Sequence, residues 1–203
     1  MSATRIVVSA FGAVVAFAGI EHGVGEILQG AVAPNALVIE SWPDTEAFAI
    51  LAGEPAMTLI PNLLLSGVVT VVVALAVGIW SVWFVERRHG GLVLIGLSIL
   101  LLLVGGGFGP PLIGIIIGIG ATRIGAVARQ PPGEALRGLG RFWPWILGGG
   151  VLGYLGLFPG LVLLSRTVTV PDGLVYGLSA FSFGALILAL VAARAHDRAL
   201  ATE

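Results

Sequence analysis

Residues 90–122 read GGLVLIGLSILLLLVGGGFGPPLIGIIIGIGAT, and none of these 33 positions carries a charged side chain. A helix that crosses a membrane needs about 20 mostly apolar residues. The segment GGGFGPP at 105–111 interrupts the run, because glycine and proline disfavour a continuous helix. We therefore predict two membrane helices joined by a glycine-rich turn, with less apolar length than the roughly 40 residues that two full crossings need.

The rest of the chain repeats this apolar pattern. It is 57% hydrophobic and 10% charged, whereas about a quarter of a typical soluble domain is charged. The mean hydropathy is +1.05. These values predict an all-α, single-domain, multi-pass protein of the cell (plasma or inner) membrane, surrounded by lipid. Six transmembrane helices are predicted, over about 5–29, 60–85, 91–105, 110–128, 142–164 and 173–194.

The arginines predict the orientation of these six helices. Cytoplasmic loops of membrane proteins carry an excess of basic residues. If the N-terminus is cytoplasmic, nine of the ten arginines fall on the cytoplasmic side, and Arg166 falls outside. We therefore expect both termini in the cytoplasm and an acidic outer face.

The N-terminal segment has features of a signal peptide. It carries Arg5, an apolar run and an A-x-A-like site at 16–18. We nevertheless predict that it is retained as the first transmembrane helix.

Two loops are long enough to have a role of their own. In the outer loop 30–58, Pro43 suits the start of a helix and Gly53 suits its end, so we expect a short amphipathic helix that covers the bundle. The cytoplasmic loop 129–141 carries three arginines, which predicts contact with anionic lipid.

Small residues predict tight packing between the helices. Gly12, Ala16, Gly19 and Gly23 recur on one face of the first predicted helix. Small residues let helices approach closely in lipid, where the hydrophobic effect provides no drive between them.

Ionisable residues end the first predicted helix, in the stretch GIEHGVGEILQG at 19–30. On a helix, His22, Glu26 and Gln29 form one polar stripe beside the glycine face, and Glu21 points about 100° away from His22. Glu21 lies about 22 Å above the start of the apolar segment, in a hydrocarbon core of about 30 Å. The pair Glu21 and His22 is thus expected in the outer part of the membrane, and Glu26 near its surface.

This polar stripe has four interpretations. It is a helix end that satisfies the loop above, a metal site, a group that handles protons, or the polar floor of a pocket for a lipid-like ligand. A metal site is not favoured, because His89 and His196 are expected on the opposite face, so further ligands would have to be Glu21, Glu40 or other loop carboxylates.

Two other residues are linked to this stripe. If the helices around 105–111 are short, the turn lies below the outer surface at the level of Glu21 and His22, and Phe108 is a wall residue. If the turn is an ordinary surface hairpin, Phe108 is an interfacial anchor. Asn62 either reaches the stripe or forms a structural bond between helices.

The spacing of His22 and Glu26, at the outer end of a first span, resembles the emopamil-binding sterol-isomerase family. The resemblance implies acid/base chemistry by this pair. It covers these two residues only, and the further carboxylate of that family has no counterpart near Pro61 and Asn62.

The absence of motifs narrows the function. The chain has no cysteine, no hydrolase triad order and no nucleotide-binding loop, so no cofactor is identified. The net charge of −1 argues against nucleic acid. We expect an outer-leaflet site that binds or translocates a small or lipid-like ligand, with or without proton coupling. The alternatives are an accessory subunit that binds partner membrane subunits or a second copy, and an intramembrane acid/base enzyme.

Overall fold

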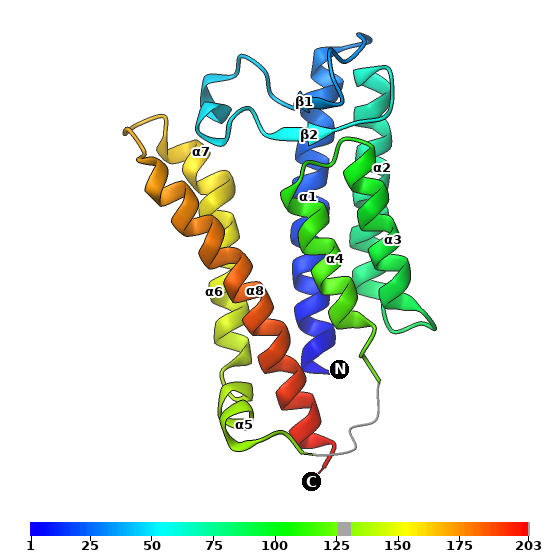
Figure 1. Ribbon diagram of the computed structural model, residues 1–203, viewed down its shortest axis with the longest axis vertical. Coiled ribbons are helices and arrows are strands. Elements are labelled where there is room, and N and C mark those ends of the chain that lie inside the picture. The colour runs from blue at the N-terminus through cyan, green and yellow to red at the C-terminus, as the bar shows by residue number, and fades with distance from the viewer. Residues whose placement is uncertain (126–130, 203) are drawn as a thin grey trace.

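The computed structural model describes residues 1–125 and 131–202, and it is predominantly helical. Helix α1 (Ala3–Gln29) lies at the centre (Figure 1). It is packed against α2 (Leu63–Ile79), α4 (Gly109–Ala121) and α8 (Asp172–Leu200). The second group of helices, α6 to α8, meets this bundle mainly through α8, and its upper part leans away from α1 (Figure 1).

Among the described residues, four helical segments are long and apolar enough to cross a membrane. They are α1, α2 continued by η2 (Trp80–Phe84), the segment 143–164, and α8. The segment 143–164 comprises α6 (Trp143–Leu155), η3 (Gly156–Gly160) and α7 (Leu161–Leu164). Helices α3 (Gly90–Leu103) and α4 are apolar but have only 14 and 13 residues, and α5 (Glu134–Gly140) is shorter still. The prediction of a predominantly helical protein is therefore confirmed, and four of its helical segments are candidates for crossing a membrane.

Two of the predicted segments extend beyond the described residues. Residues 126–128 of the predicted span 110–128, and residues 129 and 130 of the predicted loop 129–141, lie outside the described residues.

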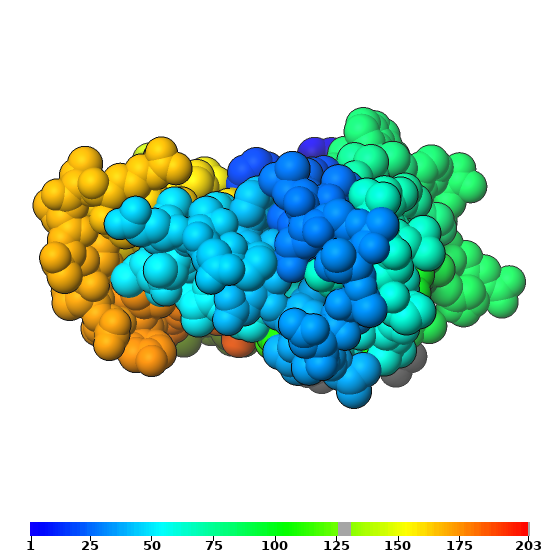
Figure 2. Space-filling view, turned by 90° about the horizontal axis from the view of Figure 1, so that it is seen from above, coloured from blue at the N-terminus to red at the C-terminus, as the bar shows by residue number. Residues whose placement is uncertain are grey.

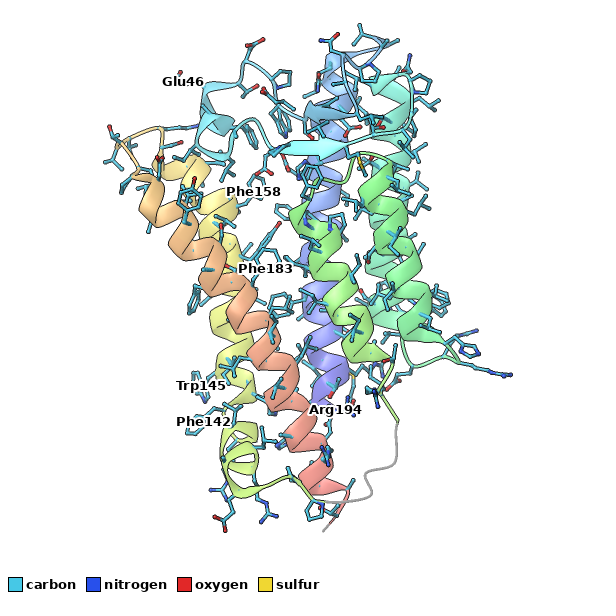
Figure 3. The ribbon with its side chains drawn as sticks, viewed as in Figure 1. Glu46, Phe142, Trp145, Phe158, Phe183 and Arg194 are labelled. Carbon is cyan, nitrogen blue, oxygen red and sulfur yellow. The ribbon has the colours of Figure 1, made fainter. Side chains whose placement is uncertain are left out.

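Large apolar side chains cover much of the outer surface. Trp145 is 81% exposed, and Figure 3 shows Phe142 and Trp145 pointing away from the bundle. Exposed apolar surface on this scale is unusual for a soluble monomer. Lipid is the solvent in which such side chains are stable.

The predicted small-residue face of α1 packs against α2 and η2. A Cβ on Gly23 would lie 2.7 Å from the Gly67 carbonyl oxygen, and one on Gly67 would lie 2.4 Å from the Gly23 carbonyl oxygen. The two backbones therefore touch at a distance that only glycine permits. In the N-terminal half of α1, Gly12 makes room for a side chain instead, since a Cβ there would lie 2.0 Å from Ser81 Oγ in η2.

The first and last helices meet at the lower end in Figure 1, which we call the arginine-rich end. The Asp197 carboxylate accepts hydrogen bonds from the backbone N–H groups of Ala3 and Thr4, at 2.7 and 2.9 Å. Beside it, Arg5 pairs with Glu86 at 2.8 Å. Helix α8, which carries Asp197, continues to Leu200, six residues beyond the predicted end at 194.

The opposite end, which we call the site end, is covered by residues 38–57, here named the hairpin lid. Strands β1 (Val38–Glu40) and β2 (Pro55–Met57) pair antiparallel, with Ile39 opposite Ala56. Between them lies the 3-10 helix η1 (Glu46–Leu51), which reaches α7 and α8. Figure 2 shows this segment lying across the top between the two helix groups.

The hairpin lid corrects two expectations. The fold is not purely α-helical, because it contains the two-stranded sheet of β1 and β2, which was not predicted. The short helix begins at Glu46 rather than at Pro43, because Asp44 adopts a left-handed backbone conformation (φ 53°) that interrupts a helix. Gly53, with φ 68°, does follow the end of the helix as expected.

Candidate functional site

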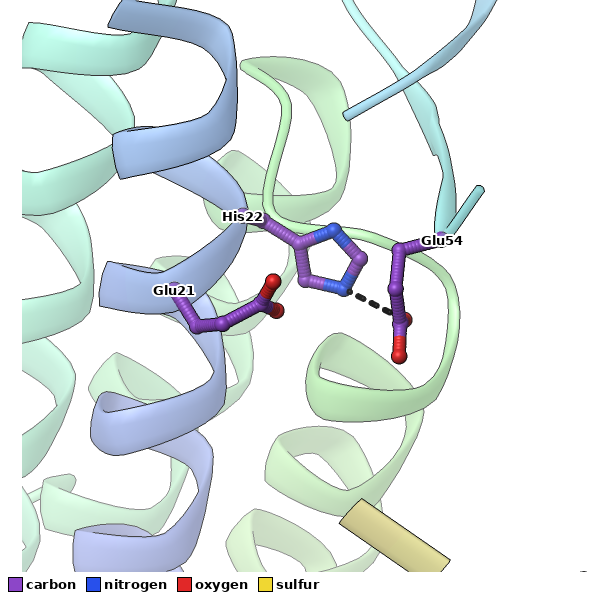
Figure 4. Close-up of side chains that lie close together, drawn as sticks. All are labelled: Glu21, His22 and Glu54. Carbon is purple, nitrogen blue, oxygen red and sulfur yellow. Dashed lines mark ion pairs between the residues drawn. The ribbon is translucent and has the colours of Figure 1, made fainter. Parts of the chain in front are cut away.

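His22 is the centre of the polar cluster at the site end. Helix α1 places it under the hairpin lid, where its side chain is 3% exposed. Its Nδ1 atom is hydrogen-bonded to Ser41 Oγ at 2.9 Å, and its Nε2 atom lies 3.3 Å from Glu54 Oε2 (Figure 4). Both ring nitrogens are therefore occupied by lid residues that are distant in sequence.

Glu21 completes a group of three ionisable side chains. One ligand atom from each of Glu21, His22 and Glu54 lies within 4.8 Å of the others. Although Glu21 leaves the helix at a different angle from His22, Figure 4 shows its carboxylate turned toward the imidazole. The Trp42 indole N–H donates to the Glu21 carboxylate. Each carboxylate thus has a defined orientation in the cluster.

The hairpin lid is held onto α1 by polar and aromatic contacts. The Gln29 amide donates to the carbonyl oxygens of Glu40 and Ser41, at 3.1 and 3.0 Å. Trp42 stacks on Phe48 with a ring separation of 4.7 Å, and Phe48 contacts Phe158. These contacts fix the position of Ser41 above His22.

Phe158 links the lid to the second group of helices. Its extended backbone (φ −141°, ψ 125°) interrupts the segment 143–164. Figure 3 shows its side chain pointing toward α1, where it contacts Phe17. The break in the helix therefore places an aromatic ring next to the lid.

The glycine-rich turn between α3 and α4 lies against the same face of α1. A Cβ on Gly107 would lie 2.2 Å from His22 Nε2, and one on Gly105 would lie 2.1 Å from Glu26 Oε1. Residues 104–107 are buried, and the Leu59 N–H donates to the Leu103 carbonyl at 2.9 Å. The turn is thus enclosed by protein, as the first of the two expectations for 105–111 requires.

Glu26 is a buried carboxylate one turn beyond His22. It is fully buried, and neither of its oxygens has a hydrogen-bond partner among the described residues. The hydroxyl groups of Ser66 and Thr70 donate instead to the Val104 carbonyl, at 2.8 and 2.5 Å. Burying a carboxylate in this state is costly unless it is protonated or near a cation.

Two residues of the predicted site lie elsewhere. Asn62 accepts a hydrogen bond from the Leu65 N–H and so caps α2, and among the described residues its side chain forms neither of the two contacts considered for it. Phe108 is 38% exposed, so it is not a wall of the buried cluster. The structure therefore brings together Glu21, His22, Glu26 and Gln29, and leaves these two outside.

The electrostatics of the cluster are unusual because, in the described part of the chain, His22 is the only basic side chain paired with its carboxylates. Among the described residues, no arginine forms an ion pair with Glu21, Glu26 or Glu54. Burial raises the pKa of the Glu54 carboxyl from its ordinary value of 4.5 to about 7. The cluster is therefore suited to hold protons or a positively charged ligand.

Glu54, Ser41 and Trp42 were not predicted as members of the site. Loop carboxylates were considered only as metal ligands, and no spacing rule connects position 54 with position 22. As expected, His89 and His196 lie near the arginine-rich end, preceding α3 and near the end of α8. A metal ion at the site end would thus be held by one histidine and two carboxylates.

No protein-family model, no curated protein and no solved structure matches this chain. The resemblance to the sterol-isomerase family accordingly rests on the spacing of His22 and Glu26.

Proposed function

We propose that this is a multi-pass protein of the cell membrane with a ligand site in its outer leaflet. The four long segments cross fully, α3 and α4 form a shorter hairpin of two crossings, and both termini are cytoplasmic. Support comes from the arginines, since Arg194 and the start of α1, which carries Arg5, lie at the opposite end from Glu46 on the hairpin lid (Figures 1 and 3).

The site under the hairpin lid binds or translocates a small or lipid-like ligand, with exchange of protons at its carboxyl groups. This proposal depends mainly on one observation: the partly buried carboxylates of Glu21 and Glu54 converge on the buried His22, and no arginine pairs with them in the described part of the chain. Buried charges require compensation, so carboxylates gathered in this way are neutralised by protons or by a bound ligand. A purely structural helix end would not need a second carboxylate beside the first.

The orientation is testable because the chain has no cysteine. Single substitutions Glu46→Cys, Arg88→Cys and Thr202→Cys place a thiol at exposed positions. In spheroplasts, a membrane-impermeable maleimide should label Glu46→Cys directly, and the other two only after permeabilisation. The reverse pattern would overturn the proposed orientation.

The ligand site is tested by native mass spectrometry of the full-length protein in mild detergent. We expect the wild type to retain a non-protein mass that His22→Ala and Glu26→Gln lose while remaining folded. Glu46→Gln, an exposed lid carboxylate, is the matched control and should retain it. If the wild type and all variants carry the same masses, the ligand site is wrong. A stoichiometric second polypeptide would instead favour the accessory-subunit alternative, and bell-shaped pH dependence of lipid turnover the enzyme alternative.

A further inference from the structure

We propose that the ligand at this site is a divalent first-row transition metal ion, such as Zn²⁺, held by Glu21, His22 and Glu54. This inference rests on the proposed function, because it names the ligand class of the same site. It differs from the sequence analysis, which did not favour a metal, because the hairpin lid supplies the ligand Glu54.

The geometry of the three side chains fits such an ion. Zinc binds histidine nitrogen and carboxylate oxygen at about 2.0–2.2 Å, so two ligands of a tetrahedral ion lie roughly 3.3–3.6 Å apart. His22 Nε2 and Glu54 Oε2 are 3.3 Å apart, and a Glu21 oxygen lies within 4.8 Å of both. To complete the set, the Glu21 oxygen has to approach from within 4.8 Å to about 3.6 Å of the other two ligand atoms. Three protein ligands leave one position for water or a further ligand.

The combined charge of the three side chains also matches that of a divalent ion. Two carboxylates and a neutral imidazole carry a charge of −2, which one divalent ion cancels. A neutral site is far less costly to bury than a charged one. A monovalent organic cation would leave one negative charge uncompensated.

The residues around the three ligands are arranged as the outer shell of a metal site. A metal-binding histidine almost always uses its other ring nitrogen for a hydrogen bond that fixes the ring. His22 Nδ1 has this contact with Ser41 Oγ at 2.9 Å, which leaves Nε2 directed at Glu54. The Trp42 N–H similarly orients the Glu21 carboxylate.

Glu26 provides an independent indication of a cation. It is fully buried, lies on the same face one turn from His22, and has two carboxylate oxygens without partners among the described residues. Glu26 and His22 both lie against the glycine-rich turn, at Gly105 and Gly107. A buried carboxylate without partners is stable when it is protonated or lies near a cation, and a metal ion at His22 would place a cation about one helical turn away.

The test uses the full-length protein in detergent, stripped with a chelator and titrated with ZnCl₂ by calorimetry, with elemental analysis for stoichiometry. We expect one zinc ion per chain. Glu54→Gln and Glu21→Gln should weaken zinc binding by at least about 100-fold, because each removes a ligand. Ser41→Ala should weaken it by about 10- to 100-fold, as outer-shell substitutions do.

Glu40→Gln is the matched control, since Glu40 lies in the same lid, is exposed and is outside the cluster. It should bind zinc like the wild type. His22→Gln should abolish binding, and if it fails to fold, Glu54→Gln in the lid still tests the site. With Co²⁺ in place of Zn²⁺, the wild type and Glu40→Gln should show the intense visible absorption of tetrahedral coordination, and Glu54→Gln should not.

Sub-stoichiometric zinc, or equal affinity in the wild type and Glu54→Gln, overturns the metal proposal. If a different mass is then still retained by the wild type and lost by His22→Ala, the proposed function stands and only the ligand class is wrong. If no non-protein mass retained by the wild type is lost in His22→Ala, the metal proposal and the proposed ligand site are both wrong.

Discussion

The acidic side chains have different surroundings at the two ends of the molecule. At the arginine-rich end, Glu86 pairs with Arg5, and Asp197 caps the first turn of α1. At the site end, Glu21 and Glu54 lie together with His22, and no arginine pairs with them in the described part of the chain.

This difference distinguishes acidic residues that stabilise the fold from those that form the proposed ligand site. Acids that are paired with a cation or a helix N-terminus stabilise the fold. Acids that are gathered and buried destabilise it unless something is bound. Substitutions at the arginine-rich end should therefore change stability and leave ligand binding intact, whereas substitutions at the site end should change binding.

The largest effect is expected for Gly107→Ala. Gly107 has φ 72°, which disfavours any side chain, and an added Cβ would displace the His22 ring. We expect a loss of about 2 kcal/mol in the free energy of unfolding, together with loss of the retained ligand. Unfolding by SDS in mixed micelles and native mass spectrometry measure the two quantities.

Gly109→Ala is the control within the same turn, because an added Cβ there meets nothing within 4 Å. It should change the free energy of unfolding by less than about 0.5 kcal/mol. Equal effects of the two substitutions would contradict the account of the turn.

A smaller effect is expected from pH, measured in the presence of a chelator. Because the pKa of Glu54 is raised from 4.5 to about 7 in the folded protein, the folded state binds this proton more tightly than the unfolded state. The contribution of Glu54 to stability is thus fully present below pH 4.5 and declines as the pH rises through 7. Glu54→Gln should flatten this part of the profile relative to the wild type, which also contains the neighbouring Glu21 and His22. Identical profiles would show that Glu54 is not buried as described.

Asp197→Ala should remove two charge-assisted hydrogen bonds to the first turn of α1. We expect a loss of about 1–2 kcal/mol in the free energy of unfolding, with unchanged zinc binding. Asp197→Asn, which keeps an acceptor oxygen, should lose less. A change in zinc affinity would show that the two ends are coupled.

The smallest effect is expected for the pair of Arg5 and Glu86, whose side chains are 24% and 46% exposed. A double-mutant cycle with Arg5→Ala and Glu86→Ala should give a coupling of less than about 1 kcal/mol, since solvent screens partly exposed pairs. A value well above this would mean that the arginine-rich end is more deeply buried than the structure shows.

Local patterns in the sequence predicted the features that depend on neighbouring residues. Apolar runs indicated the helices, including the two short ones around 105–111. Helical spacing indicated that Gly19 and Gly23 pack against another helix and that His22, Glu26 and Gln29 share a face. The two strands of the lid escaped prediction because β1 and β2 have three residues each, too few for an alternating pattern.

The sequence by itself determined that this is a helical protein with apolar helices long enough to cross a membrane, and that its first helix ends in a polar stripe. Only the tertiary structure decided which residues complete that stripe. Ser41 and Glu54 are 19 and 32 positions from His22, and they reach it because the lid folds back over α1. Periodicity records which residues share a face of one helix, whereas contacts between distant segments depend on how the whole chain packs.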